Sequence, residues 1–497
     1  MTDAMTIPPA SDPSKRELFG QPRGLFTLFF TEMWERFTYY GMRAILILFM
    51  VAAISDGGLA INDRTASAIY GLYIGGTYIL ALFGGWIADR LIGGQRAVIA
   101  GGILIMVGNA LLALGQNEVF FIGLFVIVLG VGLLKPNISA IVAQLYPEGG
   151  SRRDAGFSIF YMGINIGAFL GSLLVPIAAA HFGWHWGFAL PALGMAIGLV
   201  QFMLTRRYLG TAGAEAASDA KRGSWLPVTL FVIASVVVTA LTFVGTIEID
   251  PVALSIAVTW LIICVAIGYF VYLLFFAGLI GVERGRVFAI IALFVSCAIF
   301  WAGFEQAGAS LNLFAERYTD RQMFGWEMPA GVLQAVNPLF IILFAPVFAA
   351  LWINLGRRNM DLSAPGKFAL GLILMGVGFF VMFLAARYVV QGEHVLPTWL
   401  ILTYLFHTFG ELCLSPVGLS SMTKLAPPRF VGQVMGLWFL ATALGNNIAG
   451  QISGEFDANN IASIPDQFLK IFWWGGIAGI VMLLITPFVK RLMGGVK

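Results

Sequence analysis

Four ionisable side chains and two tyrosines lie close together in an apolar stretch near the amino terminus, TEMWERFTYYGMR (31–43). Glu32 and Glu35 are three residues apart, and Arg36 follows Glu32 by four, so a helix would place them on one face. Burial disfavours a charged carboxylate, whereas a neighbouring cation favours it. A carboxylate balanced between these effects can bind and release a proton as its surroundings change. The spacing therefore indicates a proton-binding group, and no acidic cluster suggests a divalent metal site.

Three further charged residues interrupt long apolar stretches: Lys135, Glu305 and Glu411. Charged side chains inside a membrane are costly, and they usually face a cavity or a partner charge. Pro136 follows Lys135 directly, and Pro416 comes shortly after Glu411. These residues indicate one central polar site, and the alternative is a set of structural salt bridges between helices.

The elements that must position these residues are apolar helices. Of the 497 residues, 59% are hydrophobic and 11% are charged, whereas a soluble domain has roughly 25% charged residues. A span needs about 20 apolar residues. We expect fourteen: 24–54, 66–89, 96–115, 118–143, 154–180, 187–205, 225–246, 251–280, 287–315, 329–354, 367–390, 397–423, 430–452 and 468–489. No recurring alternation of polar and apolar residues favours a β-barrel.

The basic residues predict the orientation, because cytoplasmic loops are rich in Lys and Arg. With the amino terminus inside, 21 of the 29 basic residues fall in inside segments, and five fall outside: Arg64, Arg317, Arg321, Arg387 and Lys470. The chain is therefore expected to be a multi-pass protein of the cell (inner) membrane with both termini in the cytoplasm. The net charge of +3 is too small to suggest nucleic-acid binding.

The polar segment 206–224 reads as a cytoplasmic linker between two groups of six helices. Two helices without charged residues follow it, and we expect them to form a lipid-facing insertion. The expected units are a tail 1–23, a six-helix bundle 24–205, the linker 206–224, the insertion 225–281, a second bundle 282–489 and a tail 490–497. The buried charges then fall on the first or fourth helix of each bundle, as in transporters built from repeats.

Several motifs resemble those of the proton-dependent oligopeptide transporter family. The segment EMWERFTYYG (32–41) matches its E-x-x-E-R-F-x-Y-Y-G signature. The similarity continues along the chain in GGWIADR (84–90), GLLKPN (132–137), FSIFYMGINIGAF (157–169), FWAGFEQAG (300–308), NPLF (337–340), GELCLSPVG (410–418) and GQVMGLWFLATALGN (432–446). The resemblance implies a major facilitator fold with two extra central helices, and proton-coupled import of di- and tripeptides.

The resemblance also implies roles for individual residues. The proton-coupling group would be Glu32, Glu35, Arg36 and Lys135. The substrate-binding set would be Arg43, Tyr39, Tyr40, Tyr78, Lys135, Asn165, Trp301, Asn337, Glu411, Ser415 and Trp438. Of these, Arg43 and Lys135 would attract the peptide carboxylate, and Glu411 with the two asparagines would hold its amino end.

Gating roles fall to four residues. Glu305 would close the outer side against Arg43, while Asp89 and Arg90 belong to a loop typical of major facilitators. On spacing alone the aromatic residues could be ordinary packing, the asparagines could join helices, and His407 reads as structural. The charged segment 316–327 reads as a solvated loop.

Rival functions fit the residues less well. A carrier of the same fold for nitrate or a drug is the main alternative, but a simple anion needs no acidic partner such as Glu411. An enzyme would need a nucleophile with a base or a metal set, and Cys264, Cys297 and Cys413 offer neither. A channel would show a repeated filter. We expect no enzyme activity, no cofactor and no metal, and a monomer whose partners are peptides, protons and the lipid bilayer.

Overall fold

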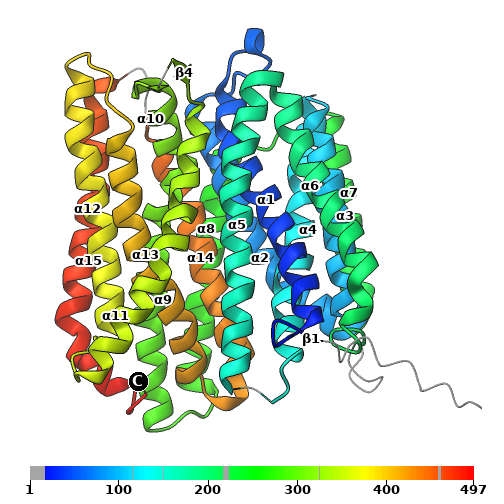
Figure 1. The fold of residues 1–497 in the computed structure, drawn as a ribbon, viewed down its shortest axis with the longest axis vertical. Helices are drawn as coiled ribbons and strands as arrows, with labels where there is room; N and C mark the ends of the chain where they lie inside the picture. The colour runs from blue at the N-terminus through cyan, green and yellow to red at the C-terminus, as the bar shows by residue number, and fades with distance from the viewer. Residues whose placement is uncertain are drawn as a thin grey trace, which may run out of the picture.

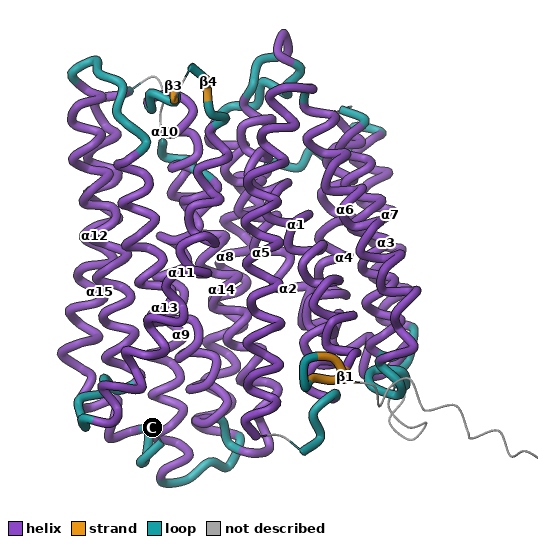
Figure 2. Tube along the Cα trace, in the orientation of Figure 1, coloured by secondary structure: helices purple, strands orange, loops and turns teal. Residues whose placement is uncertain are grey.

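The computed structural model describes residues 17–115, 117–148, 150–216, 223–323, 325–456 and 460–496. In these ranges the chain is almost entirely helical, and long helices run side by side along the molecule (Figure 1). Two antiparallel strand pairs occur, β1 (Glu17–Leu18) with β2 (Gln21–Pro22), and β3 (Gln322–Met323) with β4 (Trp326–Glu327). They mark opposite ends of the molecule, called here the β1 end and the β3–β4 end (Figure 2).

The long helices follow one another through short connections, as predicted. The amino-terminal bundle contains α1 (Arg23–Val51), α2 (Asp63–Ile87), α3 (Gly94–Ala113), α4 (Asn117–Gln144), α5 (Gly150–Phe182) and α6 (Trp184–Thr205). Next come α7 (Leu226–Phe243) and α8 (Pro251–Val271). The carboxy-terminal bundle contains α9 (Val282–Phe304), α10 (Ser310–Tyr318), α11 (Val336–Arg357), α12 (Ala364–Val390), α13 (Thr398–Leu425), α14 (Val431–Ser453) and α15 (Ile464–Leu492). Eleven helical segments of the described chain are long and apolar enough to cross a membrane.

Two expected spans are not continuous α-helices. The span 287–315 is broken by a 3₁₀ turn at Glu305–Gly308, and Ala309 (φ −122°, ψ −104°) redirects the chain before α10. The span 329–354 begins with a 3₁₀ segment, Ala330–Ala335, before α11. A count of apolar residues does not register such breaks, because each broken turn is short and apolar residues dominate the span around it.

Glycines let the helices of the amino-terminal bundle approach one another closely. A Cβ added at Gly167 of α5 would lie 2.1 Å from the Met33 carbonyl oxygen of α1, and one at Gly171 would lie 2.2 Å from that of Phe37. Small residues at such contacts allow the close backbone packing on which helix association in lipid depends. This seam fixes the helix that carries Glu32, Glu35 and Arg36.

The two central helices differ from each other. No described residue of α7 is buried, which agrees with the expected lipid-facing position. Helix α8, however, buries one face, formed by Ser255, Thr259, Ile262, Ala266 and Phe270, and it packs against both α2 and α14. The expectation of a wholly lipid-facing insertion was therefore wrong for α8.

The two bundles meet through polar contacts toward the β3–β4 end. Ser67 of α2 donates a hydrogen bond to Ser453 of α14 (3.1 Å between the two Oγ atoms). Asn312 of α10 donates to the Ala44 carbonyl oxygen of α1 (2.9 Å). Arg317 forms a bidentate ion pair with the Asp63 carboxylate (2.6 and 2.7 Å). The bundles are thus joined at this end of the molecule.

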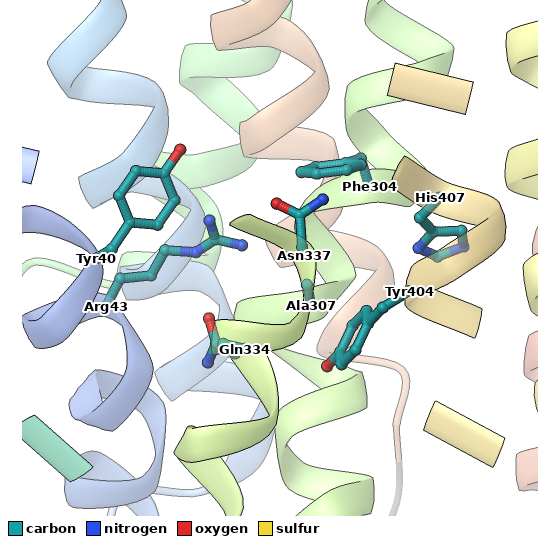
Figure 3. A pocket seen from close by; sticks show the side chains of 8 residues that line it. All are labelled: Tyr40, Arg43, Phe304, Ala307, Gln334, Asn337, Tyr404 and His407. Carbon is teal, nitrogen blue, oxygen red and sulfur yellow. The ribbon is translucent and has the colours of Figure 1, made fainter. Parts of the chain in front are cut away.

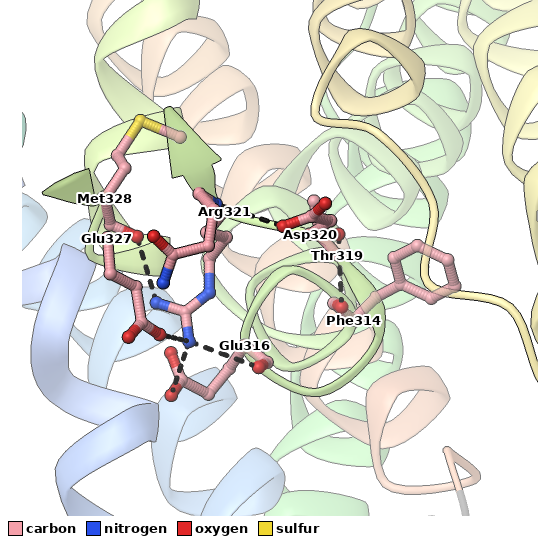
Figure 4. A network of polar contacts seen from close by, with 8 residues as sticks. Phe314, Glu316, Thr319, Asp320, Arg321, Glu327 and Met328 are labelled. Carbon is pink, nitrogen blue, oxygen red and sulfur yellow. Dashed lines mark hydrogen bonds and ion pairs between the residues drawn. The ribbon is translucent and has the colours of Figure 1, made fainter. Parts of the chain in front are cut away.

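The segment 316–327 at the same end is more ordered than the predicted solvated loop. The Arg321 guanidinium binds the carboxylates of Glu316 (3.1 Å) and Glu327 (3.3 Å) and the carbonyl oxygen of Met328 (2.9 Å) (Figure 4). These contacts hold the β3–β4 strand pair over a cavity of about 670 Å³ between the bundles. This cavity lies at the β3–β4 end, next to the polar contacts that join the two bundles.

Candidate functional site

Helix α1 brings together the predicted proton-binding group. Arg36 Nε lies 3.1 Å from Glu32 Oε1 and also contacts the Glu35 carboxylate. The exposed fractions of Glu32, Glu35 and Arg36 are 3%, 0% and 4%. One oxygen of each carboxylate and one guanidinium nitrogen have no hydrogen-bond partner in the described chain. Two carboxylates therefore share one guanidinium group where the side chains have almost no exposure to solvent. Protonation of one carboxylate leaves Arg36 to neutralise the other.

Lys135 of α4 is the next cation in the amino-terminal bundle. Its Nζ lies 3.6 Å from the ring centroid of Tyr78 in a cation–π contact, and no ion pair of Lys135 occurs among the described residues. Lys135 and Tyr78 both remain partly exposed. The structure therefore leaves the ammonium group able to bind a negatively charged group.

A buried three-residue contact joins α1 and α2 to the broken end of α9. Arg43 Nη2 lies 3.2 Å from Glu305 Oε2, Arg43 Nε donates to Tyr70 Oη at 2.9 Å, and Tyr70 donates to Glu305 Oε2 at 3.4 Å. A Cβ at Gly308 would lie 1.8 Å from Tyr70 Oη, so only glycine leaves room for this contact. The predicted Arg43–Glu305 pair is present, whereas Tyr70 was not predicted.

Asn337 and Glu411 form the polar site of the carboxy-terminal bundle. The side-chain amide of Asn337 donates to Glu411 Oε2 (3.2 Å) and to Thr408 Oγ1 (2.9 Å). Asn337 and Glu411 are both partly exposed. Asn165 of α5 is buried and donates to the Tyr161 carbonyl oxygen of its own helix (2.9 Å). The structure therefore pairs Asn337 with Glu411 and does not bond Asn165 to them.

A small cavity lies between the Arg43 contact and Asn337. It is lined by Tyr40, Arg43, Phe304, Ala307, Gln334, Asn337, Tyr404 and His407 (Figure 3). Phe304, Gln334 and Tyr404 were not predicted as site residues, and His407 was expected to be structural. Phe304, Gln334 and Tyr404 come from three separate elements and carry no charge, so spacing along the chain gives no signal for them.

The predicted aromatic residues divide into two groups. Tyr40, Tyr78 and Trp301 are partly exposed, and the Tyr78 ring faces Phe439 of α14 across the bundles with centroids 6.5 Å apart. Tyr39 is buried and stacks on Tyr73 (6.4 Å). Trp438 is 6% exposed and packs against Phe368 (6.4 Å).

The remaining predicted residues lie at the edges of the site. The Ser415 hydroxyl is buried, without a hydrogen-bond partner in the described chain, one turn after Glu411. Asp89 and Arg90 are exposed in a π-helical turn, Ala88–Ile92, toward the β1 end. They lie apart from the central residues.

Comparisons with known proteins agree with this geometry. The family model described as "POT family" matches residues 95–468. The chain is 42% identical to the peptide transporter YePEPT of Yersinia enterocolitica subsp. palearctica, covering 98% of each chain. It is 38% identical to a di-/tripeptide transporter of Lactococcus lactis subsp. lactis, covering 97% of this chain and 99% of the relative.

A solved structure shows the same architecture. The crystal structure of the peptide transporter POT in complex with sulfate superposes with a TM-score of 0.89 at 43% identity and 97% coverage of each chain. The likeness extends over both bundles and the two central helices, so it supports the major facilitator fold expected from the sequence. This chain therefore belongs to the POT family of membrane transporters.

Proposed function

We propose that the protein imports di- and tripeptides together with protons by alternating access. The observation that carries this proposal is that the two bundles carry unlike charged groups within their helices. The amino-terminal bundle supplies Lys135 and the Glu32–Glu35–Arg36 group, and the carboxy-terminal bundle supplies the Asn337–Glu411 pair. A short peptide is a zwitterion, and cations on one bundle with an acid on the other match its two ends. Relatives named as peptide transporters support the same reading.

Arg43 and Glu305 act as a gate in this mechanism. Together with the Ser67–Ser453, Asn312–Ala44 and Arg317–Asp63 contacts, they close the β3–β4 end, which we assign to the outside. Asp89 and Arg90 lie toward the other end and take a conformational role there. The division into bundles 24–205 and 282–489 gives the two bodies that move, and the transporter acts as a monomer.

Substituting Glu411 by Gln should weaken binding of peptides with a free amino terminus far more than binding of their amino-acetylated forms. Losing a charged partner in a buried site costs about 2–5 kcal/mol, which raises Kd by roughly 30-fold or more. Competition binding with matched free and acetylated dipeptides measures the difference. Thr408→Val is the control, because it removes the other acceptor of Asn337 and leaves the acid in place.

Equal losses for free and acetylated peptides would show that Glu411 does not bind the amine. Nitrate and a dye belong in the same competition panel. If either competed better than every peptide, the non-peptide carrier of the same fold would become the better assignment.

The orientation predicts which ends of α12 a membrane-impermeant thiol reagent reaches. Met360 and Glu393 flank α12 on opposite sides of the bundle and are both exposed. In a chain without its three native cysteines, Glu393→Cys should react from outside intact cells, and Met360→Cys should react only after permeabilisation. The reverse pattern would contradict cytoplasmic termini. A label at Ser218 of the linker would test the same orientation, but Ser218 lies outside the described residues.

A further inference from the structure

Helix α8 carries a polar stripe that bonds to α14. Asn447 Nδ2 donates to the Ser255 carbonyl oxygen and to Thr259 Oγ1, both at 2.7 Å, and Ser255 Oγ donates to Asn447 Oδ1 at 3.1 Å. One turn further along α14, Gln451 Nε2 donates to Thr259 Oγ1 (2.8 Å) and to Ser255 Oγ (3.1 Å). We call these four residues the α8 clasp.

Three of the four clasp residues are buried between helices, and Gln451 is partly exposed. The exposed fractions of Ser255, Thr259 and Asn447 are 0%, 9% and 1%. Polar side chains between helices in a membrane form contacts of modest individual strength, but several of them here converge on two adjacent turns of each helix. The clasp therefore fixes both the rotation and the register of α8 against α14.

Two further contacts fasten the other end of α8 to the same region of the chain. Tyr269 donates a hydrogen bond to the side chain of Gln433 at the start of α14. Arg429, just before α14, donates to the Ala277 carbonyl oxygen just after α8 (2.7 Å). Helix α8 is thus bonded to the α14 region near both of its ends.

The contact with α2 has a different character. Helix α8 also packs against α2, but no hydrogen bond or ion pair between them occurs in the described parts of the chain. Between α2 and α14 the contact is made largely by backbone and small residues: a Cβ at Gly71 would lie 3.0 Å from the Gly450 Cα, and one at Gly75 would lie 3.1 Å from the Ala443 carbonyl oxygen. Among the described residues, separating these two helices breaks the single Ser67–Ser453 hydrogen bond, whereas separating α8 from α14 would break the whole clasp.

We propose that α8 is a fixed part of the carboxy-terminal moving body, and that the clasp residues position α14 for its separation from α2 when the transporter opens at the β3–β4 end. The bonded helices α8 and α14 then move together, and α2, which packs against both of them, moves relative to the pair. The proposal rests on the proposed alternating-access function only for its effect on transport. The prediction of which bodies move together does not depend on the substrate.

Distances between spin labels test the moving bodies in the full chain. Labels replace three lipid-exposed residues, Trp260 on α8, Ile103 on α3 and Ile480 on α15. The distance between the labels at 103 and 480 reports movement of one bundle against the other. All distances are therefore measured in two conditions between which this distance changes. The 260–480 distance should stay constant and the 260–103 distance should change. The opposite result, with α8 following α3, would overturn the proposal.

A pair of matched substitutions tests the clasp itself. Ser255→Ala with Thr259→Val removes the hydroxyl groups on which Asn447 and Gln451 rely. The control is Ser235→Ala with Thr242→Val on α7, whose hydroxyl groups donate only to carbonyl oxygens of their own helix (2.8 and 2.9 Å). Ala307 lines the central cavity. The rate at which a thiol reagent added from outside labels Ala307→Cys therefore reports how often the β3–β4 end opens.

The clasp variant should change the labelling rate and the maximal rate of peptide counterflow by roughly three- to tenfold, with a smaller change in KM, because it alters a conformational equilibrium. The α7 variant should match the parent. Thr259→Ser keeps the hydroxyl group that accepts from Asn447 and Gln451, so this variant should stay close to the parent in both measurements. A well-folded clasp variant with the labelling rate and counterflow of the parent would overturn the positioning role. A parent protein that does not transport peptides would instead contradict the proposed function.

Discussion

Substituting Glu35 by Gln should abolish peptide accumulation driven by a proton gradient while leaving peptide-for-peptide exchange. Glu35 is fully buried and contacts Arg36, which also lies 3.1 Å from Glu32. A glutamine at this position resembles the protonated carboxyl group in charge and shape. If Glu35 binds the driving proton, the variant is held in the state that binds peptide and can no longer exchange protons with either side.

The physical reason is reciprocity between the two ligands. When both carboxylates are ionised, they neutralise Arg36 and lower the positive potential around Lys135. Protonating one of them leaves more positive charge available for the peptide carboxylate. Proton and peptide therefore favour the same state, and each raises the affinity for the other by the same factor.

Proteoliposome uptake with and without an inward proton gradient, run beside counterflow, measures both properties. Lys135→Ala serves as the comparison, because it should abolish accumulation and also weaken peptide binding. A Glu35→Gln variant that still concentrates peptide would show that the proton binds elsewhere. His407, which lines the central cavity, and Glu305 would then be the next residues to test.

The sequence predicted those parts of the site that depend on neighbours along one helix. Glu32, Glu35 and Arg36 were placed on one face from their spacing alone, and they form a buried ion-pair group. The pairing of Arg43 with Glu305 joins residues far apart in the chain. It could be expected only from the resemblance to a family, because spacing carries no information about contacts between bundles.

Other features had no readable signal. Tyr70 is one of several tyrosines in an apolar helix, and only the fold shows that its hydroxyl group bridges Arg43 and Glu305. Ser255 and Thr259 are small polar residues in a very apolar helix, and such residues can bond to their own backbone even when they face lipid. The sequence therefore suggested a lipid-facing α8, although Asn447 and Gln451 supply partners from α14.

Substituting Glu305 by Gln should open the β3–β4 end of the protein. The Arg43 guanidinium is then left buried without its ionic partner. Breaking a buried ion pair from one side costs about 3–5 kcal/mol, so the closed arrangement at the β3–β4 end should lose most of its advantage. We expect Ala307→Cys, which lies in the cavity below this contact, to become reactive from outside in the Glu305→Gln background.

A charge exchange separates gating from substrate binding, since Arg43 is assigned to both. Arg43→Glu combined with Glu305→Arg restores an ion pair across the same interface and should return Ala307→Cys labelling toward the parent rate. Peptide binding should remain impaired, because the cation has moved from α1 to the end of α9. Arg43→Glu alone places two acids together with no cation between them and should be the most open variant. If the exchanged pair restored both closure and peptide affinity, Arg43 would act only in the gate, and Lys135 would be left as the cation that binds the peptide carboxylate.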